Sequence, residues 1–418
     1  MAHTLLLCIV AVSILLMLVR PRGIAEVYWV GGGALALIAG RLIPISVAGR
    51  AIAKGTDVYL FLAGMMLLSE IARENGVFDC LSALAVTHAR QSSLRLFLLL
   101  YIAGVCVTAC MSNDATAIVL TPAVLAAVRR ARANPLPYLF ACAMIANAAS
   151  FVLPISNPAN LVVFHAAMPP LASWLISFLL PSAASILATY AVLRWYFRRE
   201  LDTPIDCNRE PAELTTGGKL VLAGLALVVA VLLTASAFGR DLGLPTFLAA
   251  VAISIPVLIR SRTNPLAIVR EISWSTIALV AALFILVEAV DSIGALHFTR
   301  NALAYAQHLA PAAGALLTAF VVGIANNLIN NLPLGLIAAD TLAGTHAHGL
   351  LADIILIAVD LGPNLSVTGS LATILWLLAI RREGLNVSFL DFLKVGALAM
   401  PAALLAGTAA SLCIHLLH

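Results

Sequence analysis

Asn326-Asn327-Leu328-Ile329-Asn330-Asn331-Leu332-Pro333 lies in the middle of an apolar stretch that runs from about residue 309 to 345. About 20 apolar residues in a helix cross the hydrocarbon core of a bilayer, so this stretch is too long for one span. Lipid cannot solvate the four amides at its centre, and such a break must face protein or a water-filled cavity. The stretch is therefore either two short spans or one re-entrant helical hairpin whose tip lies inside the membrane.

A second stretch of this kind occupies about residues 94–128, with Ser112-Asn113-Asp114 at its middle. Two more apolar runs contain polar interruptions, one at Ser156-Asn157-Pro158-Ala159-Asn160 and one at Gly369-Ser370-Leu371-Ala372-Thr373. A hairpin and a pair of short spans both return the chain to the side it left. The expected topology is therefore the same for either alternative.

The composition agrees with a membrane protein. Of the 418 residues, 62% are hydrophobic and 11% are charged, whereas a soluble chain carries roughly 25% charged residues. With a net charge of only +4, the chain is neither an ordinary soluble enzyme nor a nucleic-acid binder. We expect an all-α polytopic protein with about ten transmembrane helices and two re-entrant hairpins. The ten apolar runs are at about 4–19, 24–45, 57–76, 137–168, 171–193, 218–238, 244–259, 274–293, 350–380 and 390–416.

The basic residues predict the orientation in the bilayer. Ten crossings place nineteen of the 24 Lys and Arg on one side, and cytoplasmic loops carry such an excess. The segment 194–219, which is the longest polar one, then lies in the cytoplasm. Both termini are expected on the opposite, periplasmic side of a bacterial inner membrane.

The landmarks recur in order, which predicts two inverted repeats with five crossings each. Asn113 and Asn330 are 217 residues apart, and so are the starts of the runs 57–76 and 274–293. We expect a first repeat at 1–197, a cytoplasmic linker at 198–216 and a second repeat at 217–418. Secondary transporters with inverted repeats bind substrate near the midplane, at interrupted helices.

The breaks supply amides and hydroxyls, which donate and accept hydrogen bonds, and they contain no Lys or Arg. This chemistry suits a small neutral polyhydroxylated solute or a dehydrated cation. Alternatively, these side chains only bond the backbone groups that Pro122, Pro158, Pro333 and Pro363 leave free. The expected substrate contacts are Asn113, Thr116, Asn157, Asn160, Asn327, Asn330, Asn331, Asn364, Ser366, Thr368 and Ser370.

Four acidic residues are candidates for proton coupling. A carboxylate inside a membrane is costly when ionised, which makes Asp114 the first candidate and Asp360, at another break, the second. Glu70 and Glu288 lie nearer the ends of their spans, where pairing with a basic residue such as Arg73 competes with transport.

At these same residues the chain resembles the arsenite permease (ArsB) family of arsenical pump membrane proteins, in the ion transporter superfamily. The resemblance covers essentially the whole chain, and its most specific part is Gly362–Ser370 followed by Leu371-Ala372-Thr373-Ile374-Leu375-Trp376. The stretches that carry it are Ser112–Pro122, Ser156–Asn160, Asn326–Pro333, Asp360–Ser370 and Arg381–Gly384.

The resemblance implies export of arsenite and antimonite as neutral trihydroxides, driven by the proton gradient and giving arsenic resistance. It also implies inverted repeats with re-entrant hairpins. In some members a separate cytoplasmic ATPase joins the permease and powers it. No cofactor and no resident metal is expected.

Two other readings remain open. A sodium-coupled carboxylate transporter or a sodium/proton transporter could use the same scaffold, because Asp114 at one tip and Asn331 at the other are compatible with sodium coordination. An intramembrane enzyme is disfavoured, because the chain has no Walker A loop, HExxH or GxSxG motif.

The predicted orientation can be measured with a cysteine engineered in the linker 198–216. A membrane-impermeant maleimide should label it only after intact cells are opened, because the basic residues keep this segment in the cytoplasm. A cysteine engineered beside residue 3 should react in intact cells. Labelling of the linker from outside would reverse the orientation.

Overall fold

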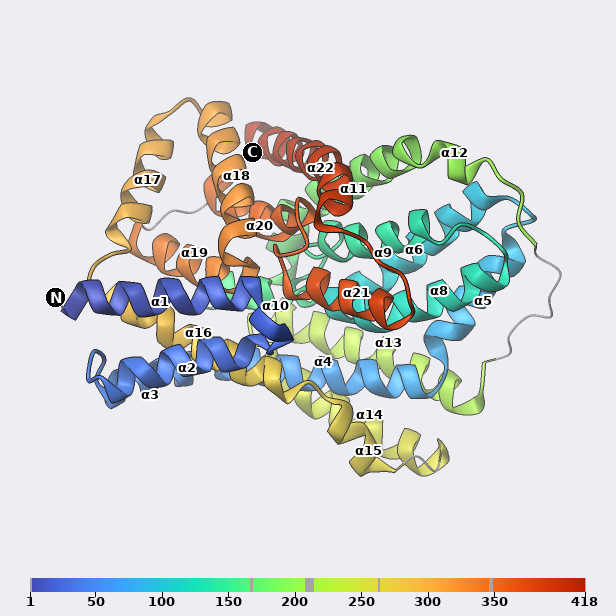
Figure 1. Ribbon diagram of the computed structural model, residues 1–418, viewed down its shortest axis with the longest axis horizontal. Helices are drawn as coiled ribbons and strands as arrows, with labels where there is room; N and C mark the ends of the chain where they lie inside the picture. The colour runs from blue at the N-terminus through green and yellow to red at the C-terminus, as the bar shows by residue number, and fades with distance from the viewer. Residues whose placement is uncertain (1, 166–167, 207–213, 262–263, 346–348, 418) are drawn as a thin grey trace.

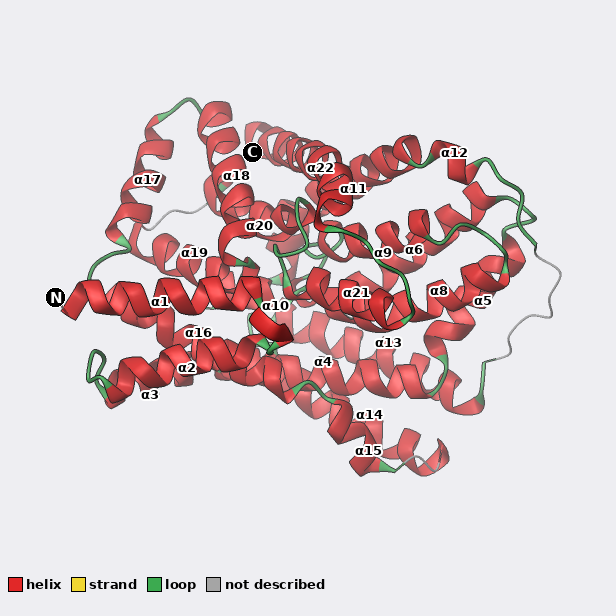
Figure 2. Ribbon diagram, in the orientation of Figure 1, coloured by secondary structure: helices red, strands yellow, loops and turns green. Residues whose placement is uncertain are grey.

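The structure, a computed structural model, describes residues 2–165, 168–206, 214–261, 264–345 and 349–417. Figure 2 shows helices joined by loops, and these residues contain no β-strand. The predicted all-α class is therefore confirmed. Part of the predicted linker, residues 207–213, lies outside the described residues.

The first half of the chain forms twelve α-helices among the described residues. Their bounds are α1 Ala2–Val19, α2 Glu26–Ala39, α3 Ile45–Lys54, α4 Thr56–Glu74, α5 Val77–His88, α6 Ser93–Cys110, α7 Asn113–Ala115, α8 Thr121–Arg130, α9 Leu136–Ala148, α10 Pro158–Val163, α11 Leu171–Tyr196 and α12 Arg198–Leu201. Three short elements join them: η1 Pro21–Gly23, the π-helical η2 Thr116–Leu120 and η3 Pro154–Ser156.

The second half forms ten α-helices among the described residues. Their bounds are α13 Thr216–Ala237, α14 Gly243–Ser261, α15 Pro265–Glu271, α16 Trp274–Ser292, α17 His297–His308, α18 Pro311–Ile329, α19 Asn331–Thr345, α20 Leu350–Leu361, α21 Leu371–Arg382 and α22 Phe389–Leu417. The 3-10 turn η4, Gly362–Asn364, follows α20 directly.

Among the described residues, eight helices are long and apolar enough to cross a membrane: α1, α6, α11, α13, α14, α16, α18 and α22. The pair α3 and α4, bent by 48°, makes up to nine. These eight or nine spans do not correspond one to one with the ten predicted crossings. α2 has only 14 residues, and the predicted spans 137–168 and 350–380 are each interrupted. Conversely α6 and α18, the first arms of the two predicted hairpins, have 18 and 19 residues, which is close to span length.

The four helix breaks occur where the polar residues predict them. α6 ends at Cys110 and α7 begins at Asn113, while α18 ends at Ile329 and α19 begins at Asn331. Asn330, between the last two, has φ +81°, a conformation that asparagine adopts more readily than most residues. The other two breaks precede α10 and α21, and an Asn or Ser side chain caps each of these helices.

The two halves of the chain are interleaved. Figure 1 shows the N-terminus at one end of the long axis, with α5 and α12 at the opposite end. We call these the N-terminal end and the α5/α12 end. α11 packs along α22, where Ser185 Oγ donates to the Ala403 carbonyl at 3.1 Å, and α4 packs along α14. The first and second halves therefore share one core, in which α9, α10, α20 and α21 are central.

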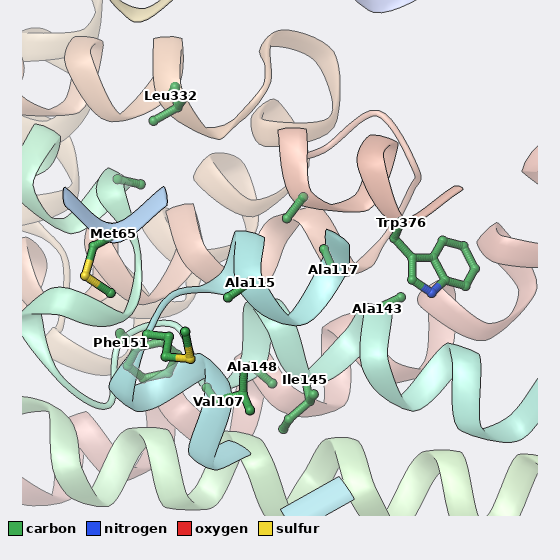
Figure 3. Packing of buried hydrophobic residues seen from close by; sticks show 14 of the residues in the cluster. Met65, Val107, Ala115, Ala117, Ala143, Ile145, Ala148, Phe151, Leu332 and Trp376 are labelled. Carbon is green, nitrogen blue, oxygen red and sulfur yellow. The ribbon is translucent and has the colours of Figure 1, made fainter. Parts of the chain in front are cut away.

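Small residues bring the central segments together. Figure 3 shows Ala115 and Ala117 on the short helical segment after the first break, close to α9 with Ala143 and Ala148. All four are buried. Without a hydrophobic drive between helices in lipid, such small residues allow the close backbone approach that holds them.

The outer surface is apolar, as a bilayer requires. Leu187 on α11 is 66% exposed and Leu227 on α13 is 57% exposed. In water each leucine left exposed would forgo roughly 1.5–3 kcal/mol of burial free energy. Contact with hydrocarbon removes that cost.

Gly396→Ala tests the close contact between α22 and η4. A Cβ at this position would meet the carbonyl oxygens of Asn364 and Leu365, both at 2.4 Å. We expect the substitution to destabilise the protein by about 1–3 kcal/mol, as overpacking does. Thermal unfolding in detergent measures it. Gly31→Ala is the matched control, because nothing lies within 4 Å of a Cβ there. Equal unfolding temperatures for the two variants would contradict the contact.

Candidate functional site

The break after α9 meets the break after α20 in the middle of the molecule. We call these two breaks, with the polar side chains that bond to them, the centre. Asn147 Nδ2 donates to Asn364 Oδ1 at 2.9 Å, and Asn364 Nδ2 donates to the Met144 carbonyl at 3.0 Å. Both asparagines are fully buried. They are 217 residues apart, which equals the offset of the predicted repeat.

A carboxylate lies in the same region. Asn157 Nδ2 donates to Asp360 Oδ1 at 2.7 Å, and Asn157 Oδ1 accepts from the Ala159 backbone at the start of α10. Asp360 is fully buried, and its second oxygen has no hydrogen-bond partner among the described residues. An unpaired buried carboxylate oxygen is costly, so this atom is available to a proton or a ligand.

We call the break between α6 and α7 the first tip and the break between α18 and α19 the second tip. The second tip is tied to the segment after η4 by a network of hydroxyls and amides. Ser366 Oγ donates to Asn327 Oδ1 at 2.7 Å and lies 3.0 Å from Thr368 Oγ1. Asn327 Nδ2 donates to the carbonyls of Gly323 and Gly362, both at 2.9 Å. Asn327, Ser366 and Thr368, three of the predicted substrate contacts, therefore lie side by side.

Asn330, Asn331 and Ser370 complete this network. Asn330 Nδ2 donates to the Thr368 carbonyl at 3.3 Å, and the Asn331 backbone donates to the Gly369 carbonyl at 3.0 Å. Ser370 caps α21 by accepting from the Thr373 backbone. The buried Asn331 Oδ1 has no partner among the described residues.

The first tip faces a separate cavity. Asp114 is half-buried and lines a space of about 80 Å³ with Ser112, Glu70 and Glu271. No Lys or Arg is among its lining residues. Glu70 is at the end of α4 and Glu271 at the end of α15, so this cavity extends from the tip towards the α5/α12 end. Asn113 Oδ1, buried beside Asp114 in sequence, has no partner in the described part of the chain.

Two predicted contacts are used by their own segments. Thr116 Oγ1 lies 2.8 Å from Thr108 Oγ1, which ties the tip to α6. Asn160 Nδ2 donates to the carbonyls of Ser150, Leu153 and Pro154. These bonds satisfy backbone groups freed by the breaks, as the alternative reading of the sequence describes.

The two glutamates pair with basic residues. Arg73 Nε donates to both carboxylate oxygens of Glu70, at 3.1 and 3.0 Å, as the sequence predicts. Glu288 Oε2 lies 2.6 Å from Lys54 Nζ. Both glutamates are therefore already engaged by a cation.

Asn147 and Asn326 belong to the centre but were not among the expected substrate contacts. Asn326 Nδ2 donates to the Ala358 and Val359 carbonyls at 3.2 and 2.5 Å, and so joins α18 to α20. The sequence signal for Asn147 was its offset of 217 from Asn364. Asn326 stands out only as a further amide in an apolar helix.

Buried amides and hydroxyls at helix breaks, inside a bundle of apolar helices of span length, define a membrane transporter. The family model described as citrate transporter (CitMHS) matches residues 3–362, and the chain belongs to this family.

The arsenical pump membrane protein of Escherichia coli strain K12 is 27% identical over 98% of both chains, which confirms the resemblance noted in the sequence. An uncharacterized transporter of Mycobacterium bovis is 26% identical over 82% of both. The crystal structure of the Alcanivorax borkumensis YdaH transporter superimposes with a TM-score of 0.59 at 12% identity, covering 89% of this chain and 88% of that one. The similarity to the YdaH structure supports the helical membrane-transporter fold.

Asp360 should be needed at the centre as a hydrogen-bond acceptor. Asp360→Ala leaves the Asn157 amide buried and unpaired, and we expect a loss of about 1–3 kcal/mol of stability. Asp360→Asn retains an acceptor oxygen and should unfold close to the unmodified protein. Unfolding in detergent with denaturant measures both. Equal stability of the Ala and Asn variants would show that the Asn157–Asp360 bond contributes nothing.

Proposed function

We propose that the protein is a secondary active transporter that exports arsenite and antimonite from the cytoplasm, as neutral trihydroxides, in exchange for protons. One observation is the main support for this class of substrate. The centre is built of amides, hydroxyls and one carboxylate, and none of these groups bonds to Lys or Arg among the described residues. A solute with three hydroxyls and no charge matches this supply of donors and acceptors.

The relatives support the same substrate. The Escherichia coli protein, similar over 98% of both chains, is named an arsenical pump membrane protein. The alignment spans nearly the whole length of both proteins.

A sodium-coupled carboxylate transporter is the second candidate, because the family model is described as a citrate transporter. A multivalent carboxylate needs compensating charge, which the backbone donors at the starts of α10 and α21 could supply. The Asn157 and Ser370 side chains already accept bonds from those donors. The neutral solute therefore fits the centre better.

Proton coupling is assigned to Asp114 first and Asp360 second. Asp114 lines a cavity that extends towards the α5/α12 end. Asp360 lies fully buried at the centre beside Asn157 and Ser150, and its second oxygen has no hydrogen bond among the described residues. Two carboxylates at different depths allow protonation from different sides. Because a neutral substrate carries no charge, the membrane potential acts only on the proton. One charge that crosses 100 mV supplies about 2.3 kcal/mol.

The α5/α12 end is assigned to the cytoplasm of a bacterial cell and both termini to the periplasm, across the inner membrane. The two halves are assigned as inverted repeats, and the first and second tips as re-entrant. An ATPase subunit, where one is present, would act from the cytoplasmic end. Transport by the purified protein alone tests whether it is required.

Flux into everted vesicles decides between the two candidates. With an imposed gradient, acid inside, arsenite should accumulate without sodium and stop when the gradient is collapsed. The pH gradient drives this uptake because protons that leave the lumen are exchanged for solute. Sodium-dependent citrate flux with no arsenite flux would replace the proposal by the carboxylate transporter.

Asp114→Asn should abolish uphill arsenite uptake in the same vesicles and retain passive equilibration, because an amide cannot carry the proton. Arsenite binding, measured by equilibrium dialysis of the purified variant, should remain within about threefold of normal. Glu74→Gln, at the exposed end of α4, is the control and should transport normally. Retained pH-driven accumulation in Asp114→Asn would assign the proton to another group.

A further inference from the structure

A group of charged side chains gathers at the N-terminal end, away from the centre and from Asp114. Lys54 Nζ lies 2.6 Å from Glu288 Oε2, and Arg300 Nη2 lies 2.7 Å from Asp291 Oδ1. Asp340 on α19 interacts electrostatically with Lys54, Glu288, Asp291 and also with His165. We call His165, Lys54, Glu288, Asp291 and Asp340 the outer cluster.

The outer cluster adjoins a cavity of about 590 Å³. Lys54 and His165 line it, together with Asp57 of α4 and with Arg240 and Asp241 of the α13–α14 loop. Asp57 is engaged, because its Oδ1 accepts from the Gly243 backbone at 2.7 Å. The Lys54 side chain is 44% exposed, so solvent reaches the cluster from this end.

Within the outer cluster, His165 and Asp340 form no ion pair among the described residues. His165 Nδ1 lies 3.1 Å from the Val162 carbonyl and its ring packs edge-on against Phe284, while Nε2 has no partner among the described residues. Asp340 is half-buried and has no hydrogen bond there either, although it interacts electrostatically with the other members of the outer cluster. Glu288 and Asp291, by contrast, are each paired with a cation.

Two short helices connect these two groups with the centre. α10 begins beside Asn157, the partner of Asp360, and His165 follows two residues after its end. α19 begins at the second tip with Asn331, and Asp340 lies nine residues further on. The two helices pack together, and Gly335 of α19 faces Val162 and Val163 of α10 across this contact.

We propose that His165 and Asp340 form the proton-exchange site of the N-terminal end, where protons from the outer solution enter the transporter on their way to Asp360. Imidazole is the side chain whose charge changes nearest neutral pH, and a carboxylate without a fixed partner accepts a proton more readily than a paired one. The six residues of α10 span about 9 Å, too far for direct transfer. The proton therefore passes to the Asp360 carboxylate when the centre opens to this end.

This inference rests on the proposed function, since it supplies the outer half of the proton route for the same exchange. The charged neighbours of the pair have both signs: Lys54 and Arg240 are basic, and Glu288, Asp291 and Asp57 are acidic.

The test varies the pH of the vesicle lumen, which corresponds to the outer solution in everted vesicles, at constant pH outside. With the unmodified protein, the arsenite uptake rate should rise as the lumen is acidified. In the double variant His165→Gln with Asp340→Asn, this rise should be at least about tenfold smaller, the loss expected when the entry group no longer titrates. The KM for arsenite should stay the same, because neither residue contacts the centre.

His308→Gln is the matched control, an exposed histidine on α17 at the same end of the molecule. It should keep the normal dependence on luminal pH. If the double variant elutes as an aggregate, Asp340→Asn alone is measured.

Normal dependence on luminal pH in the double variant would overturn this inference and leave the proposed function standing. A changed KM with unchanged luminal dependence would also overturn it, because that indicates a structural role. Absence of pH-driven arsenite uptake by the unmodified protein would overturn the proposed function together with it.

Discussion

The fold depends on one constraint, that a polar group inside the bilayer must find a partner within the protein. The chain breaks four helices at depth and so frees backbone groups that lipid cannot solvate. Amides from one half then bond the other half: Asn147 with Asn364, and Asn157 with Asp360. These bonds fix which segments meet, and small residues such as Ala115 allow the approach. The centre is therefore both the structural joint and the place where a hydrophilic solute can be held.

The same bonds are the basis of the substrate class proposed above. Each amide at the centre has donors and acceptors, and several acceptor oxygens have no hydrogen bond among the described residues, including Asn331 Oδ1 and one carboxylate oxygen of Asp360. A neutral hydroxylated solute can bond to such atoms without bringing charge into the bilayer. Acidic residues take distinct positions around this centre: Asp114 in a cavity on one side, Asp360 within it, and Asp340 on the other side. The proposed proton exchange would use these carboxylates in turn.

The sequence predicts much of this architecture because polar residues are conspicuous in apolar helices. The breaks at Asn113 and Asn330 follow from that contrast, as does the pairing of Glu70 with Arg73. The partners across the centre do not follow, because a pattern along the chain carries no information on which amide faces which. α3 was not expected as a helix of its own, since Arg50 and Lys54 interrupt its apolar run. Asn160 shows the same limit, because its amide bonds to its own loop.

The central claim is that the metalloid lies at the amide centre between the two halves. X-ray diffraction at the arsenic absorption edge, on crystals of the protein grown with arsenite, tests it most directly. The account predicts one anomalous peak within hydrogen-bonding reach of Asn364, Asn157 or Asp360, and its loss when Asn364 is replaced by Ala in a protein that still folds. A peak confined to the exposed thiols Cys106 and Cys110, with nothing at the centre, would contradict the account.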